Sequence, residues 1–271
     1  MKKKKKNAKK TFKKIKKLKT HTKKINLFEK PFKKLKLAKK VRVPTGIPKF
    51  DELIEGGFEK YSTNLIVGGS GSGKSIFATQ FIMEGMKKGE KCLYVTFEEK
   101  KNQFYDNMLR FGWDLEKYEK KELFTFLEYS PIKVKTMLEE GGGTIESLVI
   151  TNKITRIVID SITSFALLFK DELERREAAL SLFNMIRKWS CTSLLTSEED
   201  PLGNEKTSKS LEFESDAIII LYYLMEKRQR KRYLEILKMR GTKHSKQIYG
   251  FSIGKGGITL ESGESFPVIK K

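Results

Sequence analysis

Residues 68–75 read Gly-Gly-Ser-Gly-Ser-Gly-Lys-Ser and match the phosphate-binding pattern G-x-x-x-x-G-K-[ST]. Glycines let a backbone wrap closely around phosphate groups in conformations that a Cβ atom would block. The N–H groups of such a loop point inward, and the start of the following helix adds partial positive charge. The pattern therefore predicts a nucleotide site in which Lys74 reaches the β- and γ-phosphates and the Ser75 hydroxyl binds Mg²⁺.

The sequence on both sides of this run distinguishes a phosphate loop from a flexible Gly/Ser turn. Apolar residues 64–67 precede it and predict a buried strand, while residues 76–83 place apolar side chains at helical intervals. Strand, glycine-rich loop and helix in that order are the structural context that the motif requires. We therefore favour the nucleotide site.

The rest of the chain alternates between strand and helix patterns. Predicted strands cover residues 91–97, 123–127, 156–160 and 192–196, and predicted helices cover residues 102–110, 144–152 and 172–188. This alternation indicates an α/β fold with a mostly parallel, doubly wound sheet. Towards the C-terminus, the strand patterns 217–224, 233–239 and 248–253 follow one another with short links, which predicts an antiparallel edge.

Positive charge is concentrated near the N-terminus. The whole chain has a net charge of +22, but residues 1–40 hold 20 lysines and one acidic residue, which leaves +3 for residues 41–271. We expect residues 1–40 to be a disordered lysine-rich tail and residues 41–271 to form the folded domain. Such a tail can bind nucleic acid through its phosphates, attract an anionic lipid surface, or only solubilise the protein.

Other features predict a cytoplasmic protein. No apolar stretch approaches the roughly 20 residues of a transmembrane helix, and no apolar segment of a secretory signal follows the basic N-terminus. Cys92 and Cys191 each stand alone in an apolar stretch. This predicts buried thiols in a reducing compartment and not a disulfide or a metal pair.

Acidic residues at predicted strand ends are candidates for the chemistry. Asp160 ends an apolar strand, where an acid can hold Mg²⁺, although an Asp in such a position also caps helices. Glu98 and Glu99 follow another strand, at the edge of the sheet where ligands of doubly wound folds bind. A carboxylate there could activate water as a general base, and both could equally be ordinary acids in the first turn of a helix.

Two further strand ends are polar, and each has two interpretations. Thr196-Ser197-Glu198 is either a sensor of the γ-phosphate or a solvated strand end. Lys238 and Arg240 are one residue apart on a predicted strand and face the same way, so they either contact a phosphate of another subunit or form a solvated edge. The N/T-K-x-D motif of guanine-specific folds does not follow the Asp-ended strand, which favours ATP as the nucleotide.

Four segments together resemble the KaiC-like branch of the RecA superfamily. They read Val-Thr-Phe-Glu-Glu at residues 95–99, Phe-Gly-Trp-Asp-Leu at 111–115, Ile-Asp-Ser at 159–161 and Leu-Glu-Ile-Leu-Lys-Met-Arg-Gly-Thr-Lys-His at 234–244. The resemblance covers about residues 43–260. It implies an ATPase with a RecA-like P-loop core that commonly assembles into a hexameric ring with ATP between subunits.

The resemblance also implies roles for individual residues. Glu98 is similar to the water-activating base, with Glu99 beside it, and Lys74 completes the catalytic group; Ser75 and Asp160 are similar to the magnesium ligands. The residues that resemble the phosphate cradle are Gly69, Ser70, Gly71, Ser72, Gly73, Lys74 and Ser75. The residues that resemble those reaching the nucleotide of a neighbouring subunit are Lys238, Met239, Arg240, Thr242 and His244.

The chain also departs from the family pattern. Clock proteins of this family carry two such domains in tandem, whereas this chain has one, so a circadian role is not expected. The glycine run at residues 141–143 and the lysine-rich tail are not recognised family features.

Three functions are compatible with these residues. The first is an ATPase that uses hydrolysis as a conformational or partner switch, which the joint presence of Glu98 and Asp160 favours. The second is a DNA-binding recombination or repair accessory ATPase, tethered by residues 1–40. The third is a nucleotide-binding scaffold that does not hydrolyse ATP.

Overall fold

The computed structural model describes residues 40–130, 132–133, 136, 143–166, 168–169, 171–203 and 213–261 of the 271-residue chain. The predicted disorder of the lysine-rich tail therefore lies outside the described residues, except for Lys40. Gly141 and Gly142 of the glycine run also lie outside them, and Gly143 is the first residue of a helix.

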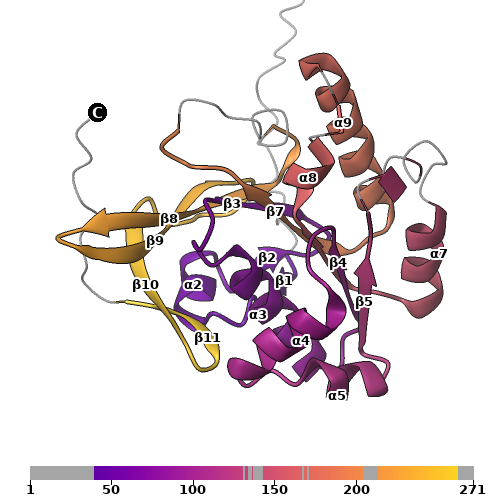
Figure 1. Cartoon of the computed structure of the whole chain (residues 1–271), viewed down its shortest axis with the longest axis horizontal. Helices are drawn as coiled ribbons and strands as arrows, with labels where there is room; N and C mark the ends of the chain where they lie inside the picture. The colour runs from indigo at the N-terminus through magenta and orange to yellow at the C-terminus, as the bar shows by residue number, and fades with distance from the viewer. Residues whose placement is uncertain are drawn as a thin grey trace, which may run out of the picture. The chain divides into compact units, whose positions relative to one another are not determined.

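Among the described residues, nine strands form one sheet in the order β11-β10-β9-β8-β3-β7-β6-β4-β5 (Figure 1). The parallel strands are β3 (Thr63–Gly68), β4 (Cys92–Thr96), β5 (Phe124–Glu128), β6 (Arg156–Asp160), β7 (Thr192–Glu198) and β8 (Ala217–Glu226). The antiparallel strands are β9 (Gln229–Met239), β10 (Ile248–Gly254) and β11 (Gly257–Leu260). The predicted α/β class, with a mostly parallel sheet and antiparallel C-terminal strands, is confirmed.

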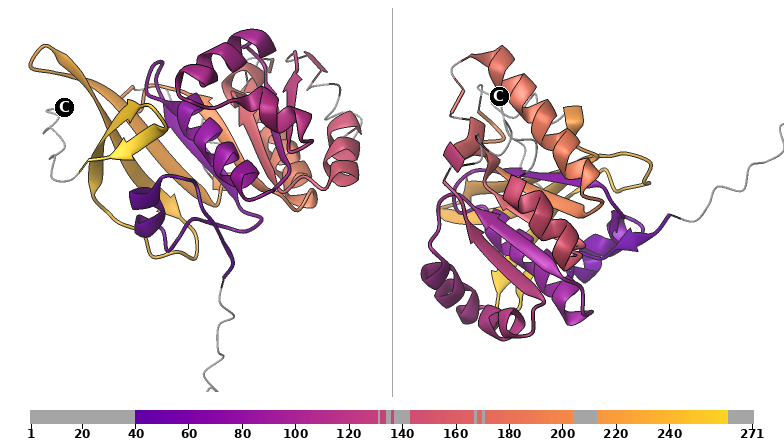
Figure 2. Two further views of the ribbon diagram at one scale, coloured as in Figure 1. Left: turned by 90° about the horizontal axis from the view of Figure 1, so that it is seen from below. Right: turned by 90° about the vertical axis from the view of Figure 1, so that its right-hand side faces the viewer.

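Helices cover both faces of this sheet, as Figures 1 and 2 show. One apolar core lies under α2 (Pro48–Leu53), α3 (Lys74–Lys87), α4 (Lys101–Arg110) and α5 (Leu115–Lys120). A second core lies on the other face, under α7 (Gly143–Asn152), α8 (Ile162–Ala166) and α9 (Glu172–Lys188). The central strands are rich in apolar residues because both of their faces are buried; β4 is buried at all of its 5 positions.

Each strand and helix predicted above is present, with ends that shift by a few residues. The elements that the sequence patterns did not predict are short: α5, α8, β11 and a small separate sheet of β1 (Arg42–Val43) and β2 (Phe58–Glu59). Elements of so few residues carry too little periodicity to be recognised. Their identification depends on the strands and helices that they contact.

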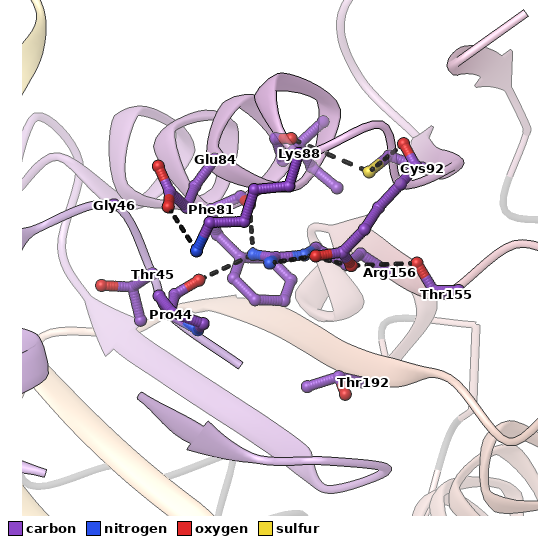
Figure 3. A network of polar contacts seen from close by, with 12 residues as sticks. Pro44, Thr45, Gly46, Phe81, Glu84, Lys88, Cys92, Thr155, Arg156 and Thr192 are labelled. Carbon is purple, nitrogen blue, oxygen red and sulfur yellow. Dashed lines mark hydrogen bonds and ion pairs between the residues drawn. The ribbon is translucent and has the colours of Figure 1, made fainter. Parts of the chain in front are cut away.

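A buried arginine fixes the start of β6 (Figure 3). Arg156 has no exposed surface, and its Nη1 donates to the Pro44 carbonyl at 2.7 Å and to the Phe81 carbonyl at 2.9 Å. Its Nε and Nη2 donate to the two carboxylate oxygens of Glu90 at 2.9 and 2.7 Å. These contacts tie β6 to α3 and to the segment before α2, and β6 is the strand whose other end carries Asp160.

The two cysteines are buried, as their apolar sequence surroundings predict. Cys92 and Cys191 are buried and free, and burial raises the pKa of the Cys191 thiol to about 12. This thiol is therefore uncharged near neutral pH. Within the part of the chain that the structure describes, no helix combines the length and the apolar character needed to cross a bilayer.

Candidate nucleotide site

The phosphate loop connects β3 to α3, as its motif requires. Gly71 and Gly73 have φ angles of +75° and +107°, in the left-handed region that side chains disfavour. A Cβ atom at Gly73 would lie 2.8 Å from Cδ1 of Ile253, and one at Gly68 would lie 2.6 Å from the Leu221 carbonyl oxygen. The loop therefore needs glycine both for its backbone angles and for its close approach to the neighbouring strands.

Lys74 begins α3 and lies among acidic groups. The residue is 8% exposed, and its Nζ donates to the Gly69 carbonyl at 3.0 Å. Burial lowers the pKa of Lys74, and the charges of Glu198, Asp160 and Glu98 oppose that shift. The structure thus brings the phosphate loop and these three carboxylates to the same edge of the sheet, at the carboxyl ends of the parallel strands.

Asp160 ends β6, between β4 and β7. Each of the two flanking strands places a hydroxyl on its carboxylate. Tyr94 Oη donates to Oδ2 at 2.6 Å, and Thr196 Oγ1 donates to Oδ1 at 2.5 Å. Thr196 is fully buried, so it is not a solvated strand end. Its hydroxyl donates a hydrogen bond to the Asp160 carboxylate and helps to hold it in place.

The available ligands fit a magnesium ion. Ser75 and Asp160 supply oxygen atoms, and α3, which carries Ser75, packs against β6. Mg²⁺ prefers oxygen ligands and is usually bound by one or two protein groups together with waters and substrate phosphates. In the described residues, no cluster of three or more His, Cys, Asp and Glu side chains offers a site made of protein ligands alone.

The two glutamates after β4 have different partners. Glu98 Oε1 accepts a hydrogen bond from the Ser161 hydroxyl at 3.3 Å and another from the Ser164 hydroxyl, both just beyond the end of β6. Glu99 Oε1 accepts from Nδ2 of Asn107 on α4 at 2.9 Å, and burial raises the pKa of Glu99. Glu98 therefore faces the end of the strand that carries Asp160, whereas Glu99 is bound to α4.

Residues 238–244 lie at the opposite end of the sheet from the phosphate loop. Met239 pairs with Ala217, which pairs with Asn64 near the start of β3, whereas Gly68 ends β3. Four residues of strand separate the two levels, which corresponds to ~13 Å. The structure therefore brings Lys74, Glu98 and Asp160 together and leaves residues 238–244 apart from them within one chain.

Several side chains of residues 238–244 have hydrogen-bond or charged partners within the same chain. β9 ends at Met239, so Arg240 lies in the following turn and not on the strand. Arg240 Nη2 donates to the Phe213 carbonyl at 2.7 Å, and Nη1 lies 3.7 Å from an Asp216 carboxylate oxygen. The Thr242 hydroxyl accepts from Arg42 at 2.8 Å, and His244 Nδ1 lies 2.8 Å from the Ser245 carbonyl oxygen.

A cavity of about 440 Å³ opens beside the phosphate loop. Its lining residues are Gly71, Gly73, Lys74, Ser75, Ile76, Phe111, Arg232 and Ile253. Arg232 Nε donates to the Gly71 carbonyl at 3.1 Å, and its guanidinium lies 4.4 Å from the centroid of the Tyr223 ring. Arg232 and Ile253 could not be recognised as site residues from the sequence, because both reach the loop from the antiparallel strands β9 and β10.

Comparisons with known proteins identify the family. A sequence model described as the KaiC ATPase matches residues 43–265. The chain belongs to the KaiC family of ATPases. A solved structure of a KaiC-like protein from the hyperthermophilic archaeon Pyrococcus horikoshii is similar, with a TM-score of 0.73 and 38% identity over 82% of this chain and 100% of that chain.

Two curated relatives differ in length. A UPF0273 protein of Pyrococcus furiosus is 34% identical over 81% of this chain and 93% of its own length. The circadian clock protein KaiC3 of Synechocystis is 33% identical over 81% of this chain but only 45% of its own length. The chain thus spans about half the length of this clock protein. Together with the family model and the solved structure, these relatives confirm the predicted KaiC-like core of the RecA superfamily.

Proposed function

We propose that this protein binds Mg-ATP and hydrolyses it to ADP and phosphate, and that hydrolysis switches its conformation or its partner. The observation that carries the proposal is the position of Glu98 and Asp160 beside Lys74, where both carboxylates act on the lysine charge. A scaffold that only binds a nucleotide needs the phosphate loop but has no need of a base beside it.

In this proposal each group of the site has one task. The loop N–H groups and Lys74 hold the β- and γ-phosphates for in-line attack by water. The Ser164 hydroxyl donates a hydrogen bond to the Glu98 carboxylate. Glu98 accepts the proton of the attacking water as the new P–O bond forms and ADP leaves. Ser75 and Asp160 would hold Mg²⁺, which supplies neutralising charge at the phosphate oxygens when it is bound.

The cavity beside the loop offers a place for the base of the nucleotide. Phe111 and Ile253 give it apolar walls, and the Arg232 guanidinium gives it a flat cationic surface. An aromatic ring and a guanidinium both stack well on a purine. We therefore expect adenine to lie between Phe111 and Arg232.

Residues 238–244 would contact the nucleotide of a neighbouring copy. Because they lie at the opposite end of the sheet from the phosphate loop, a head-to-tail arrangement of subunits would bring one group to the other. A closed arrangement of this kind is a ring, and six subunits is the size that we propose.

The test compares Glu98→Gln with the matched variant Glu99→Gln. Both remove one carboxylate charge from neighbouring positions, but we expect only Glu98→Gln to lower phosphate release by about 100-fold or more, the usual range for a lost general base. Binding of a fluorescent ATP analogue should persist in both. Normal turnover in Glu98→Gln would exclude Glu98 as the base, and no turnover in the wild type despite tight ATP binding would favour a scaffold.

A further inference from the structure

Asp160 is held by hydroxyl groups from both neighbouring strands. Tyr94 stands opposite Val158, two residues before Asp160, so the Tyr94 and Asp160 side chains emerge on the same face of the sheet. The pairing of Ile159 with Leu195 puts the next residue of β7 level with Asp160. Both carboxylate oxygens thus accept a hydroxyl hydrogen bond, at 2.6 Å from Tyr94 and at 2.5 Å from Thr196.

Tyr94 places a polar hydroxyl in an otherwise apolar, aromatic part of the core. It is 1% exposed, and its ring packs 4.7 Å from the Phe104 ring and 5.8 Å from the Phe126 ring, centroid to centroid. A phenylalanine would satisfy this aromatic cluster equally well. A buried phenol hydroxyl requires a partner, and here the partner is the Asp160 carboxylate.

Tyr94 lies on a strand between the two elements that carry the proposed magnesium residues. Its strand β4 pairs with β6, which ends in Asp160, and packs against α3, which begins at the phosphate loop and carries Ser75. Within α3 the Thr79 hydroxyl donates to the Ser75 carbonyl at 2.7 Å, whereas the single hydroxyl hydrogen of Tyr94 goes to Asp160. The hydrogen bond to the carboxylate is therefore the contact through which Tyr94 acts on this site.

We propose that Tyr94 and Thr196 are positioning residues that orient Asp160 for the bound divalent cation. The inference rests on the proposed Mg-ATP site and adds two residues to it. Each hydroxyl occupies one lone pair of one carboxylate oxygen, which leaves the other lone pairs free to face the metal or its waters. Because the two hydroxyls come from opposite sides, they prevent rotation of the carboxyl group.

The experiment measures metal binding directly. Mn²⁺ replaces Mg²⁺ as a spectroscopic probe, and electron paramagnetic resonance gives its affinity for the protein–ADP complex. Partners that orient metal ligands typically contribute 10–100-fold to metal affinity. We expect Tyr94→Phe and Thr196→Val each to weaken Mn²⁺ binding about tenfold. Thr196→Ser, which keeps the hydroxyl, should restore most of the affinity.

Two controls separate positioning from a general loss of structure. Tyr105→Phe makes the same chemical change at a phenol that donates to Glu119 at 3.2 Å, away from the phosphate loop, and should leave Mn²⁺ affinity unchanged. Binding of a fluorescent ADP analogue in EDTA should match the wild type in every variant, because in the proposed site Asp160 acts on the nucleotide only through the cation. A melting curve for each variant verifies that it is folded.

The outcomes decide between the claims. Mn²⁺ affinity within twofold of the wild type in both Tyr94→Phe and Thr196→Val would overturn the positioning role. Equal losses of Mn²⁺ and metal-free ADP affinity would also overturn it, because they indicate a general distortion. A wild type that binds Mn²⁺ and ADP but releases no phosphate would refute hydrolysis alone, and the Mn²⁺ comparison would still decide the role of the two hydroxyls.

Discussion

Replacement of Arg156 by methionine should destabilise the fold more than any loss of a surface ion pair. Methionine keeps much of the apolar stem and removes four hydrogen bonds. The Pro44 carbonyl then loses its guanidinium donor, and a buried group without a partner costs about 1–3 kcal/mol. The Phe81 carbonyl lies inside α3 and keeps its helical hydrogen bond, so the loss of its second donor costs about 0.5–1.5 kcal/mol. Glu90 is 29% exposed and can be rehydrated, so its share is about 0–1 kcal/mol. We therefore expect a loss of about 2–5 kcal/mol in the free energy of unfolding.

The assay is urea unfolding followed by circular dichroism, with Glu90→Gln as the matched control. Glu90→Gln removes the ion pair but leaves the guanidinium on both carbonyls, so it should cost less than about 1 kcal/mol. We assign the main contribution to the two carbonyl bonds. This assignment would be wrong if Arg156→Met cost less than about 1 kcal/mol, or if Glu90→Gln cost as much as Arg156→Met.

Three further predictions concern the Glu90 carboxylate, the phosphate loop and the lysine-rich tail. The hydrogen bond from Arg156 lowers the pKa of Glu90, so the stability that this carboxylate adds is present above its ordinary pKa and is lost as pH falls through the lowered value. Wild type and Glu90→Gln should therefore differ in urea midpoint at pH 7 and converge on acidification, and a constant difference would contradict this. Gly73→Ala should weaken binding of a fluorescent ATP analogue at least tenfold, because its φ is +107° and its Cβ would lie 2.8 Å from a side chain. Gly89→Ala is the control, with a φ of +78° and no neighbour within 4 Å, and should bind normally. Deletion of residues 1–40 should leave ATP binding intact and abolish binding to single-stranded DNA, which in the full chain should weaken steeply with salt; DNA affinity that survives the deletion at low salt would exclude the tail as the tether.

The local parts of the site could be predicted from sequence. The phosphate loop is a contiguous run of residues 68–75, and the strand and helix beside it were evident from apolar periodicity. Asp160 was recognisable as the acid at the end of an apolar strand. These features depend on neighbours in the chain, which the sequence shows directly.

The remaining parts depend on which strands become neighbours. Thr196 donates to Asp160, 36 residues away, because β7 and β6 are adjacent in the sheet. Arg232 donates to Gly71, 161 residues away, because β9 pairs with β8 beside the phosphate loop. Strand order is not encoded in local periodicity, so neither contact could be derived from the pattern of either segment.

Above all, we propose that the edge of the sheet with Lys74, Glu98 and Asp160 hydrolyses ATP. The most direct measurement is release of inorganic phosphate by the full-length protein with stoichiometric ATP, in Mg²⁺ and in EDTA, with the size of the particle determined in the same samples. We expect phosphate release that requires Mg²⁺, disappears in Glu98→Gln and comes from an oligomer. If the wild type in Mg²⁺ released phosphate no faster than the Glu98→Gln variant, and its bound ATP stayed intact, this proposal would be wrong.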